Sequence, residues 1–161
     1  MTQFFNFKNA ALAGIIAGAV FFAVELLLVA TVGGESPWGP PRMIAAIAMG
    51  EEVLPPPATF DLTILLVAAL VHFALAIVLG VIFALLFGRW TTSLGAALAI
   101  GTIFGLVLYA INFYVMTAVF PWFGMARNMI SIVAHAIFGL ALGWAYHALN
   151  SRVRAIESRI G

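Results

Sequence analysis

The sequence predicts an all-α integral membrane protein with four transmembrane helices. Four apolar runs are each long enough, at about 20 residues, to cross the hydrocarbon layer of a bilayer as a helix. The chain of 161 residues is 65% hydrophobic and 8% charged, whereas soluble domains carry roughly 25% charged residues. It has no cysteine, which excludes disulfides, thiolate metal sites and cysteine catalysis. Its sequence has no basic run of the kind that binds nucleic acid.

The first predicted span covers about residues 10–32 and carries one acidic residue, Glu25. This run is longer than the roughly 7–15 apolar residues of a signal peptide, so we expect a retained helix. The loop GGESPWGPP, rich in glycine and proline, then breaks the helix. The apolar segment over 42–53 is too short to span, and it predicts a short interfacial helix between the first and second spans.

Each of the other three predicted spans has a polar residue inside an apolar run. The spans cover about residues 61–88, 94–119 and 126–149. Their internal polar residues are His72, Asn112 and His135. Asp61 is in the position of an N-cap for the second span. Small residues on the helical stripe of His72 are expected to admit another helix closely; they are Ala69, Ala76, Gly80 and Ala84.

The two halves of the chain share a pattern that indicates an internal repeat. The repeats cover about residues 10–88 and 94–149, and a charged tail, 150–161, follows them. The residues of the first half that recur in the same order in the second are Gly14, Gly18, Glu25, Pro37, Trp38, Arg42, His72 and Gly80. Their counterparts are Gly101, Gly105, Asn112, Pro121, Trp122, Arg127, His135 and Gly143. Because each half has two spans, we expect two tandem helical hairpins related by a pseudo-two-fold axis along the membrane normal.

The basic residues near the span ends predict the orientation. One side of the predicted membrane carries Lys8, Arg89, Arg152, Arg154 and Arg159, and the other carries Arg42 and Arg127. Cytoplasmic loops hold the excess of lysine and arginine. We therefore expect a protein of the bacterial inner membrane with both termini in the cytoplasm.

Four polar residues are predicted to lie at one depth in the membrane. A helix rises 1.5 Å per residue, which puts all four roughly 10–17 Å below the outer surface; they are Glu25, His72, Asn112 and His135. Ionisable side chains are costly in lipid and usually face the interior of a bundle or a wet cavity. The sequence therefore predicts a polar cluster near the bundle axis.

Three interpretations of this cluster remain open at the level of sequence. In the first, the protein is a structural or accessory subunit, and Glu25 bonds to one histidine and Asn112 to the other. In the second, the cluster binds or passes a small ion or a proton in transport, or His72, His135 and Glu25 hold a divalent metal. In the third, His72 and His135 are the axial ligands of a b-type haem that carries electrons.

We expect no enzymatic activity, because no serine or threonine nucleophile with a base and an acid is visible. Arg42 and Arg127 follow the two Pro-Trp turns and are predicted at the outer mouth of the site, where they anchor to lipid phosphate, attract anions or pair with an acidic side chain: Glu51, Glu52 or Asp61. The partner expected first is the lipid bilayer. The glycine stripes and the lipid-facing surface also allow a homo-oligomer or a place in a larger membrane complex.

The stretch from Ser36 to Gly80, with its SPW, PPRMIAAI, LPPP and FD…HF segments, carries a family resemblance. It resembles a group of small four-span bacterial inner-membrane proteins of unknown function, some of which carry the label sodium:proline symporter. The resemblance implies the four-span architecture and no mechanism. Sodium:solute symporters are far longer and use discontinuous helices, so that label does not suit a chain of 161 residues.

Overall fold

All regular elements of the described chain are helices. The computed structural model describes residues 6–160, and describes side chains through residue 151. The α-helices are α1 (Phe7–Leu28), α2 (Gly39–Met49), α3 (Leu62–Phe87), α4 (Leu94–Ala110) and α5 (Met129–Ile160). Within the described residues, four helices are long and apolar enough to cross a membrane: Phe7–Gly33, Leu62–Trp90, Leu94–Ala118 and Met129–Ser151. The predicted all-α class and the four apolar spans are thus confirmed.

Short turns of other helix types continue or join these α-helices. The π-helical turns η1 (Val29–Gly33) and η4 (Ile111–Val115) follow α1 and α4 directly. The 3₁₀ turns are η2 (Glu51–Val53), η3 (Gly88–Trp90), η5 (Met116–Ala118) and η6 (Pro121–Ala126). The third predicted span, 94–119, is therefore α-helical only to Ala110.

Polar side chains at the N-termini fix where helices begin. The Asp61 Oδ1 atom accepts a hydrogen bond from Ile64 N at 3.0 Å, which confirms the predicted N-cap of α3. Asn128 caps α5 in the same way, so this helix begins at Met129 and not at 126. The helix α5 continues through the predicted tail to Ile160. The side chains of Arg152, Arg154 and Arg159, used above to predict orientation, lie outside the described part.

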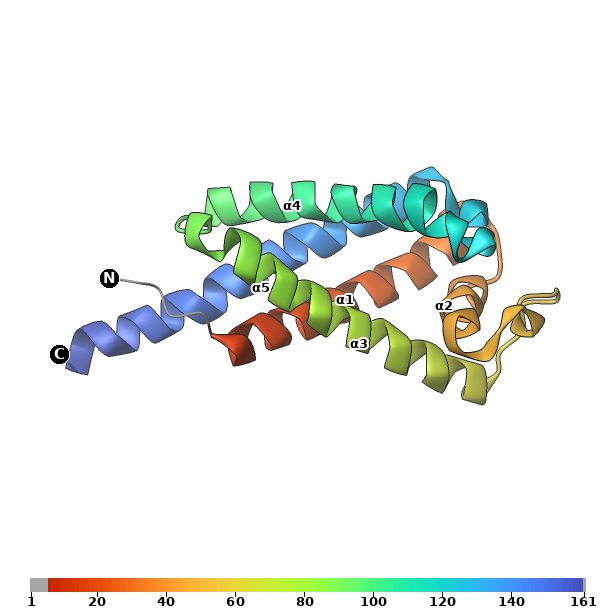
Figure 1. The fold of residues 1–161 in the computed structure, drawn as a ribbon, viewed down its shortest axis with the longest axis horizontal. Coiled ribbons are helices and arrows are strands. Elements are labelled where there is room, and N and C mark those ends of the chain that lie inside the picture. The colour runs from red at the N-terminus through yellow and green to blue at the C-terminus, as the bar shows by residue number, and fades with distance from the viewer. Residues whose placement is uncertain (1–5, 161) are drawn as a thin grey trace.

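The four long helices are packed in an order that leaves one side open. Helix α1 packs against both α3 and α5, and α4 packs against α5. Helices α3 and α4 meet at their short connection, η3, and diverge from there (Figure 1). The short helix α2 packs on α3 at the far end of the bundle (Figure 1). At the other end the beginning of α1 lies beside α5, where Asn9 Nδ2 donates to Asn150 Oδ1 at 3.1 Å.

Small residues bring α1 and α3 into backbone contact. A Cβ atom added to Gly14 would collide with the carbonyl oxygen of Ala76, and one added to Gly80 would collide with that of Ala10. Only glycine allows this approach, because the obstacle is backbone. The buried stripe of α3 comprises Ile64, Ala68, His72, Ala76, Gly80, Phe83 and Ala84. Ala69, predicted on this stripe, is only half-buried, since Ala68 takes its place one turn before His72.

Helices α4 and α5 also come into backbone contact at glycines. A Cβ on Gly101 would collide with the carbonyl oxygen of Gly139, and one on Gly143 with that of Ala97. The two pairs of closely packed helices then meet along α1 and α5.

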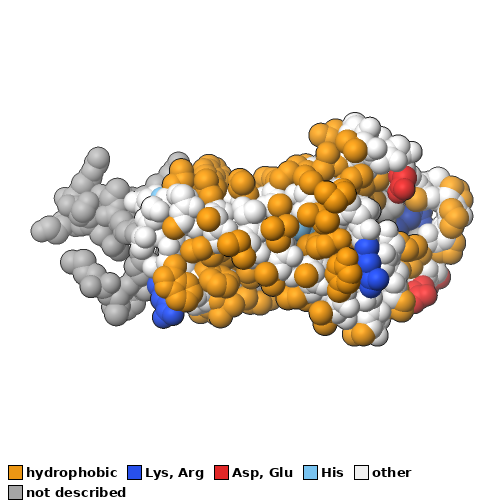
Figure 2. Space-filling model, turned by 90° about the horizontal axis from the view of Figure 1, so that it is seen from above, with side chains coloured by type: hydrophobic (Ala, Val, Ile, Leu, Met, Phe, Trp, Pro, Cys, Tyr) orange, Lys and Arg blue, Asp and Glu red, His pale blue; other side chains and the backbone are white. Residues whose placement is uncertain are grey.

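The outer surface of the bundle is apolar along its length. Figure 2 shows hydrophobic side chains over the body of the molecule and acidic side chains gathered toward one end. Leucines on α3 such as Leu66 and Leu70 are 62% and 73% exposed. Such side chains are stable where lipid replaces water, as expected for helices that cross a bilayer.

Candidate functional site

The divergence of α3 and α4 opens a large cleft in the side of the bundle. Its volume is about 970 Å³, and side chains of α1, α3, α4 and α5 line it. Helix α2 contributes Met43, Ile44 and Ile47 at the far end. The four polar residues singled out in the sequence, Glu25, His72, Asn112 and His135, all line this cleft. The structure therefore brings them together around one cavity.

His72 links α3 to α1. Its Nε2 atom lies 2.9 Å from the carbonyl oxygen of Gly18. A carbonyl oxygen only accepts, so Nε2 carries the proton and donates it. The sequence-based expectation that Glu25 bonds to a histidine is wrong here, because the close approach of α1 at Gly18 offers His72 a backbone acceptor instead.

His135 uses both of its ring nitrogens. Nδ1 lies 2.8 Å from the carbonyl oxygen of Ser131 and must donate to it. Nε2 then has a lone pair, which accepts from Asn112 Nδ2 at 3.2 Å. The predicted pairing of Asn112 with a histidine is thus present. Asn112 lies in the π-helical turn η4, whereas α1 remains α-helical past Glu25 to Leu28.

Phe21 separates the two imidazoles, and sequence analysis did not single it out. Its ring stacks on His72 with centroids 5.5 Å apart and meets His135 edge-on at 4.9 Å. Phe21 lies one helical turn before Glu25 and is therefore on the same face of α1. That spacing was the signal available in the sequence, but one phenylalanine among fourteen did not stand out.

Glu25 is the polar residue of the cleft that has no protein partner. It is 8% exposed and lines the cavity. Among the residues that the structure describes, no group donates a hydrogen bond to its carboxylate or forms an ion pair with it. Every fully enclosed side-chain nitrogen or oxygen in the same residues is hydrogen-bonded. The oxygens of the Glu25 carboxylate are therefore not fully enclosed, and the small part of them that is accessible faces the cleft.

The described residues do not form the metal-binding group that was one interpretation of the sequence. No group of three histidine, aspartate or glutamate side chains in the described chain is placed to hold a metal ion. Iron ligation by both Nε2 atoms would require breaking the bonds of His72 to Gly18 and of His135 to Asn112. The Phe21 ring also lies against both imidazoles.

Arg42, predicted at the outer mouth, lies in α2, binds backbone groups of the segment that follows this helix, and lines the cleft. Its guanidinium donates to Val53 O at 2.8 Å and to Thr59 O at 3.1 and 3.3 Å. It therefore ties α2 to the segment that leads into α3.

Arg127, the predicted counterpart of Arg42, binds groups at the end of α4. It donates to Phe113 O and, at 3.1 Å, to Thr117 Oγ1. Its guanidinium also lies 4.8 Å from the ring centroid of Tyr114. Both arginines thus hold connections between helices in place, and their position at an outer mouth stays a prediction.

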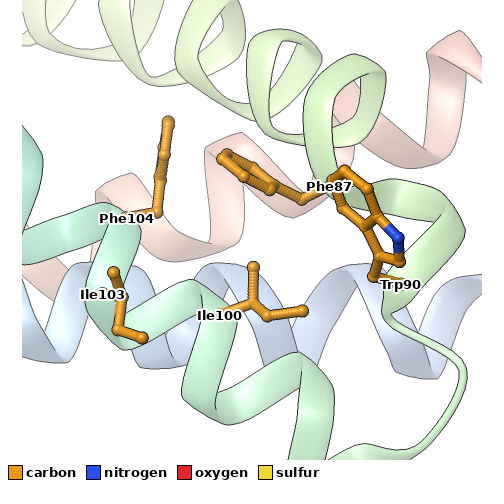
Figure 3. A pocket seen from close by; sticks show the side chains of 5 residues that line it. All are labelled: Phe87, Trp90, Ile100, Ile103 and Phe104. Atoms are coloured by element: carbon orange, nitrogen blue, oxygen red, sulfur yellow. The ribbon is translucent and has the colours of Figure 1, made fainter.

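Aromatic side chains close the cleft near the η3 connection. Phe87 and Phe104 have ring centroids 5.9 Å apart and bridge α3 and α4. Together with Trp90, Ile100 and Ile103 they surround a small apolar hollow of about 290 Å³ (Figure 3). Phe87 and Phe104 line the large cleft as well. The rings of Phe87 and Phe104 therefore close the cleft at this end.

Four long apolar helices around a lateral cavity are the architecture of a multi-pass membrane protein. Comparison of the chain with family models, with curated proteins and with solved structures finds no match in any of the three.

Proposed function

We propose that this chain is a non-enzymatic bacterial inner-membrane protein built from two tandem helical hairpins, α1 with α3 and α4 with α5. Matching glycine contacts support the internal repeat. The contact of Gly14 with the Ala76 carbonyl in the first half corresponds to that of Gly101 with the Gly139 carbonyl in the second. The excess of basic residues at one end favours cytoplasmic termini, with α2 at the outer interface.

We further propose that the cleft binds a proton or a small cation at Glu25 and passes it across part of the membrane. The observation that carries this proposal is the buried Glu25 carboxylate, which faces the cavity without a protein partner. An unpaired carboxylate in apolar surroundings needs a proton or a cation beside it. In membrane proteins such residues mark ion pathways and proton relays.

The other three polar residues have different tasks in this proposal. His72, Asn112 and His135 already hold hydrogen-bond partners within the protein. They shape the polar wall of the cleft, and Glu25 supplies the charge. A divalent metal held by the three ionisable groups is not part of the proposal, because these groups form no metal-binding arrangement.

The test is chemical modification of Glu25 in the purified, lipid-embedded protein. Dicyclohexylcarbodiimide reacts with protonated carboxyl groups in apolar surroundings and leaves carboxylates in water unmodified. We expect peptide mapping by mass spectrometry to find the adduct on Glu25, with the exposed Glu35 and Glu51 as unmodified controls. Protein without an adduct on Glu25 would contradict the proposed site.

A flux measurement tests passage separately from binding. In liposomes loaded with a dye that responds to the ion under test, the protein should dissipate an imposed gradient of protons, Na⁺ or K⁺ faster than empty liposomes do. Glu25→Gln keeps the shape of the side chain and removes the charge, so it should return the rate to the background.

The second candidate is a structural or accessory subunit in which the polar residues only pack helices. The bond from His72 to Gly18 and the bond between Asn112 and His135 favour it, because each joins two helices. This candidate gives Glu25 no task. It therefore predicts that Glu25→Gln leaves the flux as it is in the wild type and leaves stability unchanged or improves it.

A further inference from the structure

The walls of the cleft are aromatic as well as apolar. Phenylalanines from α1, α4, η4 and α5 line it, among them Phe21, Phe104, Phe113 and Phe138. The faces of aromatic rings carry partial negative charge and attract organic cations. A small inorganic ion gains little from such walls, since it prefers oxygen ligands. The lining therefore favours an organic ligand with a positive charge.

The charge pattern of the cleft agrees with this preference. Glu25 offers an unpartnered carboxylate in its depth. Arg42, the arginine in its lining, directs its guanidinium at the carbonyl oxygens of Val53 and Thr59. Glu35 also lines the cleft but is exposed, so the buried charge of the cleft is complementary to a single cationic group placed at Glu25.

Size and access define the rest of the ligand. A volume of about 970 Å³ lies at the upper end of the roughly 300–1,000 Å³ typical of sites for drug-sized molecules. The cleft opens between α3 and α4, where its edges are aliphatic side chains such as Leu75, Leu79 and Val107. Such edges admit a molecule that is dissolved in the hydrocarbon layer.

We propose that the cleft binds a lipophilic amine, which enters from the bilayer between α3 and α4 and places its ammonium group on the Glu25 carboxylate. Its apolar body lies against Phe21 and the phenylalanines of the opposite wall. This inference rests on the proposed cation site at Glu25 and names the chemical class that the site takes.

The test uses two aromatic probes that differ in charge. The protein is reconstituted into phosphatidylcholine nanodiscs, and binding of 1-naphthylmethylammonium is measured by equilibrium dialysis, with empty nanodiscs subtracted. The neutral 1-naphthalenemethanol has the same body and no charge. We expect saturable binding of about one ammonium probe per chain, with an affinity at least tenfold higher than that of the alcohol.

Matched variants locate the probe in the cleft. Glu25→Gln should weaken binding of the ammonium probe at least tenfold and leave the alcohol unaffected. Glu35→Gln, which removes an exposed carboxylate at the rim of the cleft, should change neither. Leu79→Trp, which fills the opening, should abolish binding, and Leu70→Trp on the exposed face of α3 should not.

Three results would overturn the inference: no saturable binding of the ammonium probe, equal affinity for the two probes, or an affinity that Glu25→Gln does not change. The comparison of the two probes on the wild-type protein needs no variant, so misfolding of a variant cannot obscure it. Carbodiimide labelling separates the two proposals. Labelling of Glu25 without amine binding overturns the ligand class alone, and absence of both overturns the cation site as well.

Discussion

The backbone contact between α1 and α3 predicts that Gly14→Ala destabilises the protein. The new methyl group would collide with the carbonyl oxygen of Ala76, and the next atoms, Ala76 C and Ile77 Cα, lie at 3.0 and 3.2 Å. These atoms belong to the backbone of α3, so the two helices must move apart. Overpacking of this kind costs typically 1–3 kcal/mol. The helix propensity of alanine returns up to about 1 kcal/mol.

We therefore expect a net loss of about 1 kcal/mol, which is a roughly fivefold rise in the unfolding equilibrium constant. The assay is reversible unfolding by dodecyl sulfate in mixed micelles, followed by circular dichroism. Gly95→Ala is the matched control, because nothing lies within 4 Å of a Cβ at that position of α4. It should leave stability unchanged or raise it by up to about 1 kcal/mol. Equal stability of the two variants would refute the packing of α1 on α3 described here.

Three further changes have outcomes that the structure sets. His72→Phe keeps the ring and loses the bond to Gly18; it should cost about 0.6 and at most about 1.7 kcal/mol in the same unfolding assay, and an unchanged midpoint would mean that the bond contributes nothing. Arg127→Met removes the donor to Phe113 O, so limited proteolysis should cut the turns between α4 and α5 faster than in the wild type, whereas equal rates would count against this role. Asp61→Ala removes the N-cap of α3; hydrogen exchange in the first turn of α3 should accelerate, with a loss of about 1 kcal/mol, and unaltered exchange would argue that water replaces the cap.

The four spans could be predicted because the free energy of transfer into a membrane is a sum over the residues of a segment. Each apolar residue of a helix such as α3 contributes to burial in lipid whatever its neighbours are, so length and composition suffice. The cap at Asp61 was predictable for a related reason, since it depends on residues within one turn. The end of α4 was not predictable in this way, because residues of its π-helical turn, Asn112 and Phe113, contact His135 of α5.

The common location of Glu25, His72, Asn112 and His135 followed from the constant rise of a helix, which converts position in the sequence into depth. The hydrogen-bond partners of these four side chains could not be predicted from the sequence. A hydrogen bond depends on the rotation of each helix about its axis and on a few tenths of an ångström, and local sequence specifies neither. This is why His72 bonds to the backbone of Gly18 and not to Glu25.

The amino-acid sequence alone determined that the chain has four helices long and apolar enough to span a membrane, each with a polar residue inside it, because hydrophobicity and helical rise are properties of each segment by itself. Only the tertiary structure decided that α3 and α4 diverge, that Phe21 stands between the imidazoles, and that Glu25 faces the resulting cleft without a partner. Those features arise where glycines allow two backbones to touch and bulkier side chains keep two others apart. They depend on pairs of helices, which no single segment encodes.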